Sequence, residues 1–144
     1  MRKKMMTGLC ALVALTGMLG ACSSAETDAK QLEGKWNVTA INGSAVEQVE
    51  KLPSMEFDMT GKKLHGTTSC NLYNSGLELD EAHPSTLRIT QAITTMMACP
   101  NMEVEQLFLQ TLDRVASVKT GAEAGEMLLL DEAGGVLFTL QRAD

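Results

Sequence analysis

Apolar and polar side chains alternate along much of the chain, which is the two-residue period of half-buried β-strands. In the first clear example Trp36, Val38 and Ala40 alternate with Asn37 and Thr39. A strand of this kind packs one face on a core and leaves the other in water. The pattern predicts strands at residues 36–41, 55–59, 63–68, 77–80, 86–90, 126–131 and 136–142.

Turn signals separate several of these strands. Asn42 and Gly43 follow the first strand, and both residue types tolerate the positive φ of a tight turn. Residues 60–62 (TGK) and 131–135 (DEAGG) occupy similar places between later strands. These turns predict β-hairpins and therefore antiparallel pairing.

One segment, residues 100–118, has a helical period instead. Its apolar face contains Val104, Leu107, Phe108, Thr111, Leu112 and Val115. Asn101 is placed to cap the start, and Glu103 and Glu105 lie near the positive end of the helix dipole. A single helix between two groups of strands indicates the α+β class. We expect a small curved antiparallel sheet of about seven short strands, partly barrel-like, packed with one amphipathic α-helix.

The first residues have the pattern of an export signal. Arg2, Lys3 and Lys4 precede a short uncharged apolar run that ends in small residues before Cys22. Because the run is short and ends in a cleavage-like sequence, residues 1–21 predict a secretory signal peptide rather than a membrane span.

Residues 19–22 (LGAC) resemble a bacterial lipobox, which implies cleavage before Cys22 and a diacylglyceryl group on its sulfur. The acyl chains, palmitate among them, would hold the protein on a membrane, since each buried CH₂ contributes about 0.8 kcal/mol. Residues 22–31 are small and polar and predict a flexible tether. Residues 32–144 then form one folded domain. Ordinary secretion with an incidental cysteine is the alternative.

The chain is acidic, with 12 Lys and Arg against 18 Asp and Glu and a net charge of −6. The signal peptide takes three basic residues and leaves nine, so the mature charge is −9. Such a domain lacks the basic surface that binds nucleic acid, and an anionic bilayer would repel it. The membrane is therefore a partner only through the lipid on Cys22. Ser23, not Asp, follows that site, which favours the outer membrane by resemblance to enterobacterial sorting.

Four stretches resemble one known family. They are residues 32–43 (LEGKWNVTAING), 69–73 (SCNLY), 95–100 (TMMACP) and 105–115 (EQLFLQTLDRV). In this order, followed by a final hairpin, they resemble the META domain, or HslJ-like, family over nearly all of the mature chain. The chain departs from the usual pattern at Ser69, where glycine is common, and at Gly76, where a glycine comes one residue late.

The resemblance implies a single small α+β domain of the bacterial envelope, often in a lipoprotein, with no established catalytic residues. It therefore implies a protein that is not an enzyme and needs no cofactor. We expect it to bind an envelope protein or a small hydrophobic ligand, in a stress response or in antibiotic tolerance. The family fold is similar to that of secretin pilots. The alternative is thus a pilot or chaperone role in secretion or outer-membrane assembly.

Cys70 and Cys99 match the two motif cysteines of the family. They are the pair that remains, because Cys10 lies in the predicted signal peptide and Cys22 would carry the lipid. A lone pair of cysteines in an oxidising compartment is usually a disulfide. Closing a loop of this length would stabilise the fold by about 3.6 kcal/mol in the chain-entropy model.

The neighbouring motif residues are candidates for a structural or binding role. Asn71 and Tyr73 are expected to make local hydrogen bonds that fix the cysteine loop. Thr95 and Met97 belong to the stretch 95–100, which contains the second motif cysteine, Cys99. We expect the binding surface at the open face or end of the sheet near these loops.

Two other interpretations of the cysteines remain. Cys70, Cys99, His65 and His83 could ligate zinc or copper, although neither Cys-x-x-Cys nor His-x-x-x-His spacing is present. Cys99 could also be a reactive thiol, because it lies just before the start of the predicted helix.

The methionines raise a related question. Met96, Met97 and Met102 could bind Cu(I) through their thioethers. The simpler interpretation is that they pack the start of the helix against the sheet. Met55 and Met59 alternate on a predicted strand and are expected in the core.

Overall fold

The computed structural model of the protein describes residues 26–143. The predicted signal peptide at 1–21, the lipidation site Cys22 and the first part of the predicted tether lie outside the described residues. Within the described part, no helix is both long and apolar enough to cross a bilayer.

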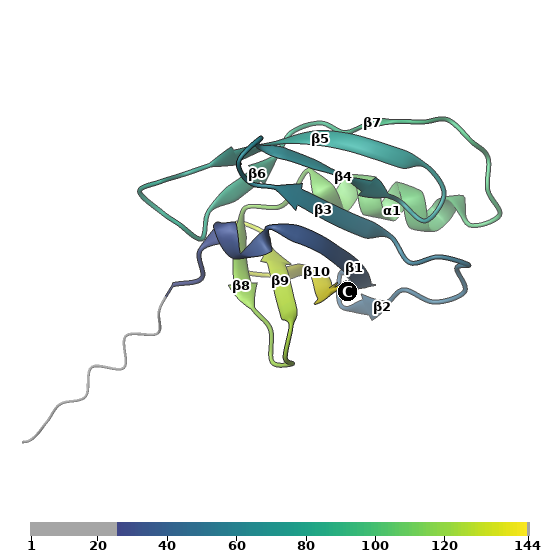
Figure 1. Cartoon of the computed structure of the whole chain (residues 1–144). Coiled ribbons are helices and arrows are strands. Elements are labelled where there is room, and N and C mark those ends of the chain that lie inside the picture. The colour runs from purple at the N-terminus through teal and green to yellow at the C-terminus, as the bar shows by residue number, and fades with distance from the viewer. Residues whose placement is uncertain (1–25, 144) are drawn as a thin grey trace, which may run out of the picture.

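Within these residues ten strands form one antiparallel sheet that curls into a nearly closed barrel (Figure 1). The main path runs β6-β5-β4-β3-β1-β10-β9-β8, with β2 added beside β1 and β7 added beside β5. The strands are β1 (Gly34–Ile41), β2 (Ser44–Ala45), β3 (Ser54–Asp58), β4 (Lys63–Thr67), β5 (Leu72–Leu79), β6 (Leu87–Ile89), β7 (Ile93–Thr94), β8 (Ser117–Thr120), β9 (Glu126–Leu130) and β10 (Val136–Arg142).

The barrel closes where β6 approaches β8. Thr86 and Ser117 form an isolated antiparallel bridge beside these two strands. Next to it the Val118 N–H donates to the Ser85 carbonyl at 2.9 Å. The two end strands of the sheet therefore satisfy part of each other's free edge.

The helix α1 (Met102–Leu112) packs on the barrel through only part of the predicted apolar face, because Phe108, Thr111 and Leu112 are buried whereas Leu107 is exposed. Phe108 is fully buried, and its ring centroid lies 5.2 Å from that of Tyr73 and 5.4 Å from that of Phe138. Both pairs are tilted, which is a favourable aromatic geometry. These rings join α1 to β5 and β10 in the centre of the core. The predicted α+β class is confirmed.

The chain enters the fold through the short 3₁₀ helix η1 (Ala29–Leu32), whose two end residues are buried. The Trp36 indole N–H donates to the Leu32 carbonyl at 2.7 Å. The Arg142 guanidinium stacks over the Trp36 ring at 4.1 Å and donates to the Glu33 carbonyl at 2.7 Å. The packed fold thus begins at Ala29, ahead of the domain start at residue 32 that the sequence predicts.

The seven predicted strands are all present, but the sheet also contains three strands and half of another that the sequence does not predict. The sequence did not indicate β2, β7, β8 or the first half of β5. In that half of β5 the apolar Leu72 is exposed and its neighbour Tyr73 is buried, so the two apolar residues in a row hide the alternation. Strands as short as β2 and β7 have too few residues to show a period.

The helix is shorter than predicted, and its cap differs. It ends at Leu112, and β8 begins within the segment 100–118 that the sequence indicates as helical. Asn101 occupies the N-cap position without making a side-chain cap hydrogen bond. Its amide donates instead to the carbonyl of Gln48. The capping prediction for Asn101 is therefore wrong, because a loop far away in the sequence uses this side chain.

Phe108→Ala should lower the free energy of unfolding by about 3–5 kcal/mol, because it empties the centre of the aromatic cluster. Leu107→Ala on the partly exposed side of the same helix should cost about 0.5 kcal/mol. Urea denaturation followed by circular dichroism measures both. Equal losses in the two variants would contradict the placement of Phe108 in the core.

Candidate functional site

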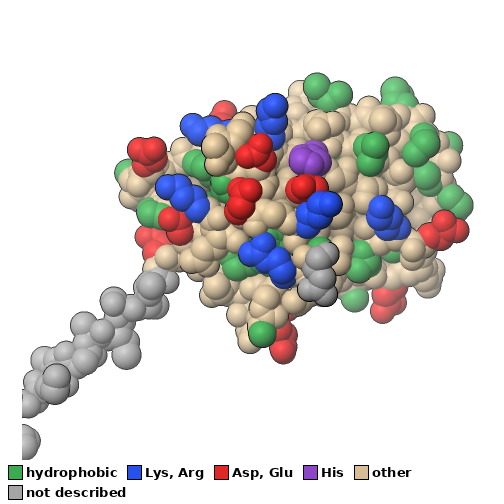
Figure 2. All heavy atoms as spheres, in the orientation of Figure 1, with side chains coloured by type: hydrophobic (Ala, Val, Ile, Leu, Met, Phe, Trp, Pro, Cys, Tyr) green, Lys and Arg blue, Asp and Glu red, His purple; other side chains and the backbone are tan. Residues whose placement is uncertain are grey.

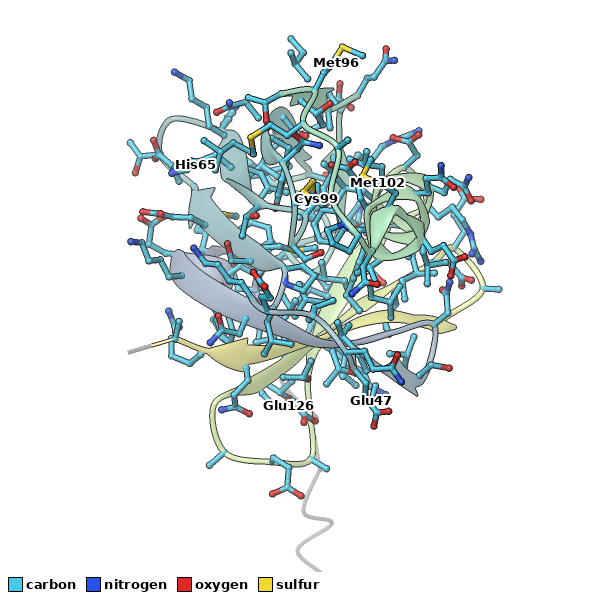
Figure 3. The ribbon with its side chains drawn as sticks, turned by 90° about the vertical axis from the view of Figure 1, so that its right-hand side faces the viewer. Glu47, His65, Met96, Cys99, Met102 and Glu126 are labelled. Carbon is cyan, nitrogen blue, oxygen red and sulfur yellow. A yellow bond between two sulfur atoms is a disulfide. The ribbon has the colours of Figure 1, made fainter. Side chains whose placement is uncertain are left out.

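A disulfide joins Cys70 to Cys99, as predicted, with their Cα atoms 5.9 Å apart. Figure 3 shows its sulfur atoms beside the label of Cys99. The bond connects the residues just before β5 to the segment that leads into α1. Because each sulfur is bonded to the other, neither cysteine offers the thiolate that a metal site or a nucleophile needs.

Asn71, the residue after the first cysteine, is buried and uses its whole side-chain amide. Its Nδ2 donates to the Met97 carbonyl at 3.1 Å and to Glu105 Oε1 at 2.8 Å. Its Oδ1 accepts from the Met97 N–H at 2.7 Å and from the Thr95 hydroxyl at 2.8 Å. All the donors and acceptor sites of the amide are thus occupied. The predicted local hydrogen bonds of Asn71 are present, to Thr68 and to the Cys70 sulfur, but its side chain also binds partners that lie 24 to 34 residues away.

Glu105 lies in the first turn of α1, as predicted, but it is also buried. Its Oε1 accepts from the Thr68 hydroxyl at 2.8 Å as well as from Asn71. The Thr68 Oγ1 in turn accepts from the Asn71 backbone N–H at 3.0 Å. A buried carboxylate is costly unless it is hydrogen-bonded, so these bonds hold the start of α1 against the β4–β5 loop.

The same loop contains a backbone conformation that favours glycine. Ser69 has a φ of 85°, in the left-handed region. A side chain with a Cβ is strained there, whereas glycine is not. The glycine that the family resemblance implies at this position would avoid this strain.

Tyr73 is placed inside the barrel rather than in the cysteine loop. It lies on β5, is fully buried, and its hydroxyl donates to the Ser54 carbonyl at 2.9 Å. Burial raises the pKa of the Tyr73 phenol above its ordinary value, so the group stays protonated and remains a donor. The prediction of a local hydrogen bond is wrong for the Tyr73 hydroxyl, whose partner lies 19 residues away, and its role in this structure is to pack the core and to join β5 to β3.

Large apolar side chains are exposed on the segment beside the disulfide. Leu72 is 61% exposed, Ile93 77%, Met96 96% and Met97 56%. We call these four residues the apolar edge. Figure 2 shows hydrophobic side chains at the surface around this end of the molecule, and in Figure 3 Met96 projects away from the body of the protein.

The apolar edge corrects one interpretation of the methionines. Met96 and Met97 do not pack the start of the helix against the sheet, because most of their surface faces solvent. Met55 and Met59, in contrast, are buried in the core as predicted. Met102 keeps a local role, since its sulfur accepts from the Cys99 N–H at 3.4 Å.

The structure does not assemble the alternative metal site. His83 Nδ1 lies 2.9 Å from Asp80 Oδ2 on an exposed turn, and this hydrogen bond raises the pKa of His83 and lowers the pKa of Asp80. His65 Nε2 lies 3.3 Å from Glu56 Oε2 on another part of the surface. Across residues 26–143 no three His, Cys, Asp or Glu side chains are grouped as metal ligands.

A surface groove of about 650 Å³ lies at the barrel seam, and its lining includes neither of the two disulfide cysteines nor Asn71. Charges of both signs line it, and Arg114 and Asp131 form an ion pair across 3.3 Å. Because the lining mixes both signs of charge and two of these groups pair with each other, the groove indicates no particular ligand.

Comparisons with known proteins agree with this architecture. The family model described as the META domain matches residues 29–144. The chain is similar to a protein from Burkholderia xenovorans solved by NMR, with a TM-score of 0.59 and 20% sequence identity, over 79% of this chain and 85% of that one.

Two further solved structures are similar. Another NMR structure has a TM-score of 0.55 at 18% identity, over 78% of this chain and 92% of that one. The crystal structure of a DUF4847 family protein from Bacteroides vulgatus has a TM-score of 0.53 at 12% identity, over 78% and 94%. At these identities the likeness concerns the fold alone. No curated protein matches the chain significantly.

Asn71→Leu should lower the free energy of unfolding by about 3 kcal/mol or more, because the buried Glu105 carboxylate, the Thr95 hydroxyl and the Met97 backbone lose their hydrogen bonds to the amide, and each unpaired group costs about 1–3 kcal/mol. Asn74→Leu, the same change at an exposed position of β5, is the matched control and should cost about 0.5 kcal/mol. Urea denaturation measures both variants. Similar losses at the two positions would show that the amide network contributes little.

Replacing both Cys70 and Cys99 by Ser should lower the free energy of unfolding by about 3.6 kcal/mol, since the unfolded chain regains its loop freedom. A reducing agent should shift the urea midpoint of the natural chain in the same direction and leave that of the double variant unchanged. A natural chain whose midpoint ignores the reducing agent would contradict a stabilising disulfide.

Proposed function

Because the chain belongs to the META domain family, we propose that it is a binding module of the bacterial cell envelope rather than an enzyme, with a protein as its partner at the apolar edge. The observation that carries this proposal is the exposure of four large apolar side chains at one end of the fold. Adjoining exposed apolar side chains on a folded domain are typical of an interaction site.

The apolar edge is held in place before any partner arrives. Asn71 binds both backbone groups of Met97, and the disulfide fixes the chain two residues further on. A surface ordered in advance loses less conformational entropy on binding than a flexible loop does. This rigidity supports recognition of a partner rather than a loop exposed by chance.

The interior of the barrel supports a protein partner over a small hydrophobic ligand. The rings of Tyr73, Phe108 and Phe138 contact one another in its centre. Small-molecule sites are concave and usually bury most of the ligand. The apolar edge is a projecting surface, which suits a second protein better.

A lipid anchor at Cys22, in the outer membrane, completes the proposal. The described chain starts at Glu26, and the Ala29 N–H bonds to the Pro84 carbonyl at 2.8 Å. Figure 1 shows this start away from β7, so an anchored protein would present the apolar edge away from the membrane surface. A role in stress or antibiotic tolerance rests on the family resemblance.

The alternative is a pilot or chaperone role for a secretion or assembly component. Among residues 26–143 no strand pairs with the outer edge of β7. This favours the alternative, because an extended segment of a client protein can add to a free strand edge. One abundant secretin-like or assembly partner would distinguish this role from a general binding module.

A photo-crosslinking amino acid at position 96 of the full chain, expressed in cells, should give discrete crosslinked proteins on irradiation, because this side chain lies within the proposed contact. The same amino acid at position 136, a moderately exposed apolar site on β10, is the control and should not give them. Leu72→Asp should weaken the products from position 96. Identical products from both positions, or none from position 96, would contradict the proposal.

A further inference from the structure

The segment that is hydrogen-bonded along β5 extends beyond the two residues of β7. The Thr95 N–H donates to the Leu72 carbonyl at 3.0 Å, which continues the β5–β7 ladder. Beyond it, the Asn71 side chain takes the place of a strand, binding the N–H of Met97 at 2.7 Å and its carbonyl at 3.1 Å. Residues 93–97 are therefore anchored along their inner side.

The outer side of this segment is available for another strand. Successive residues of an antiparallel strand turn their N–H and C=O groups to opposite sides. Ile93, Thr95 and Met97 turn their backbone N–H and C=O groups toward β5 and Asn71. The backbone N–H and C=O groups of Thr94 and Met96 therefore point outward. None of the loop and turn hydrogen bonds described within residues 26–143 involves the backbone of Thr94 or Met96.

Charge indicates which partner fits. The chain is acidic, but from Gln91 to Met102 it contains no charged residue. Natural proteins usually protect a free strand edge with charges or proline, and residues 91–98 have neither. A basic peptide would find no acidic partner within this segment. A second copy of the chain brings the same neutral strand, so no like charges oppose each other along the ladder.

We propose that the apolar edge joins two copies of this chain, which pair antiparallel across a two-fold axis at Thr95. This rests on the proposed function and names its partner. Thr94 of one copy then lies opposite Met96 of the other, so the outward backbone groups meet. Ile93 lies opposite Met97 of the second copy on one face, so exposed apolar side chains cover each other.

The oligomeric state of the full chain tests the proposal. Native mass spectrometry of the protein purified from membranes in detergent should show a dimer that dissociates on dilution. Ile93→Lys places a charge on the edge, and Thr94→Pro removes an outward N–H without touching the inner bonds. Each change should weaken the dimer by about tenfold or more. Val136→Lys, at an exposed apolar site elsewhere, is the control and should leave the dimer intact.

Cysteine crosslinking tests the register. Two full chains with different tags, one Ile93→Cys and the other Met97→Cys, should form a reducible mixed dimer under mild oxidation. Opposed residues of this kind have Cα atoms about 4.5 Å apart, within disulfide range. A dimer of two Ile93→Cys chains, or of two Met97→Cys chains, should link poorly. In either dimer the introduced cysteines of the two copies would be about 13 Å apart.

The outcomes distinguish failure of the two-copy pairing from failure of the proposed binding function. A monomer at every concentration, a dimer that survives both edge substitutions, or efficient linking of either cysteine variant with itself overturns the paired edge. If position 96 crosslinks only to a different protein in cells, the second copy is the wrong partner while the binding function stands. Self-crosslinks from position 96, lost in Ile93→Lys, support both.

Discussion

The side-chain amide of Asn71 is the interaction on which the motif end of the structure depends. It takes the place of a missing strand for Met97 and at the same time binds Thr95 and Glu105. An aspartate would lack the two N–H donors of the amide, and an apolar side chain would lack both the donors and the acceptor oxygen. Because Asn71 and Glu105 are both buried, the hydrogen bond between them is stronger than it would be in water, and its loss costs more. This explains how one residue can shape a surface segment that has few other contacts.

The disulfide and the amide network constrain the same region in different ways. The Cys70–Cys99 bond limits how far the two segments can separate. The hydrogen bonds of Asn71 fix how they face each other, and Glu105 extends this control to the first turn of α1. Helix, loop and apolar edge therefore form one rigid unit, with Thr68 as the contact between them.

Period-2 alternation predicted most of the barrel because those strands each bury one face, and the cysteine count with an oxidising compartment predicted the disulfide. The site itself was less accessible. Asn71 binds residues far away in the sequence, and no local pattern reports such contacts. Met96 and Met97 are of an apolar residue type that is common in protein cores. Only the three-dimensional structure shows that nothing in the described chain covers most of their surface. Tyr73 was misplaced because the exposed Leu72 beside it obscures the alternation.

The barrel joins an early strand to a late one. β1 pairs with β10, and Arg142 donates to the carbonyl of Gln31, 111 residues away in the sequence. A chain that emerges from the ribosome or is exported N-terminus first exposes β1 long before β10 exists. Until then Trp36 and Val38 lack their final neighbours, and the barrel stays open. Folding that waits for such distant contacts is slow and leaves apolar strands free to aggregate. The newly made chain therefore needs protection from its surroundings until its last strand arrives.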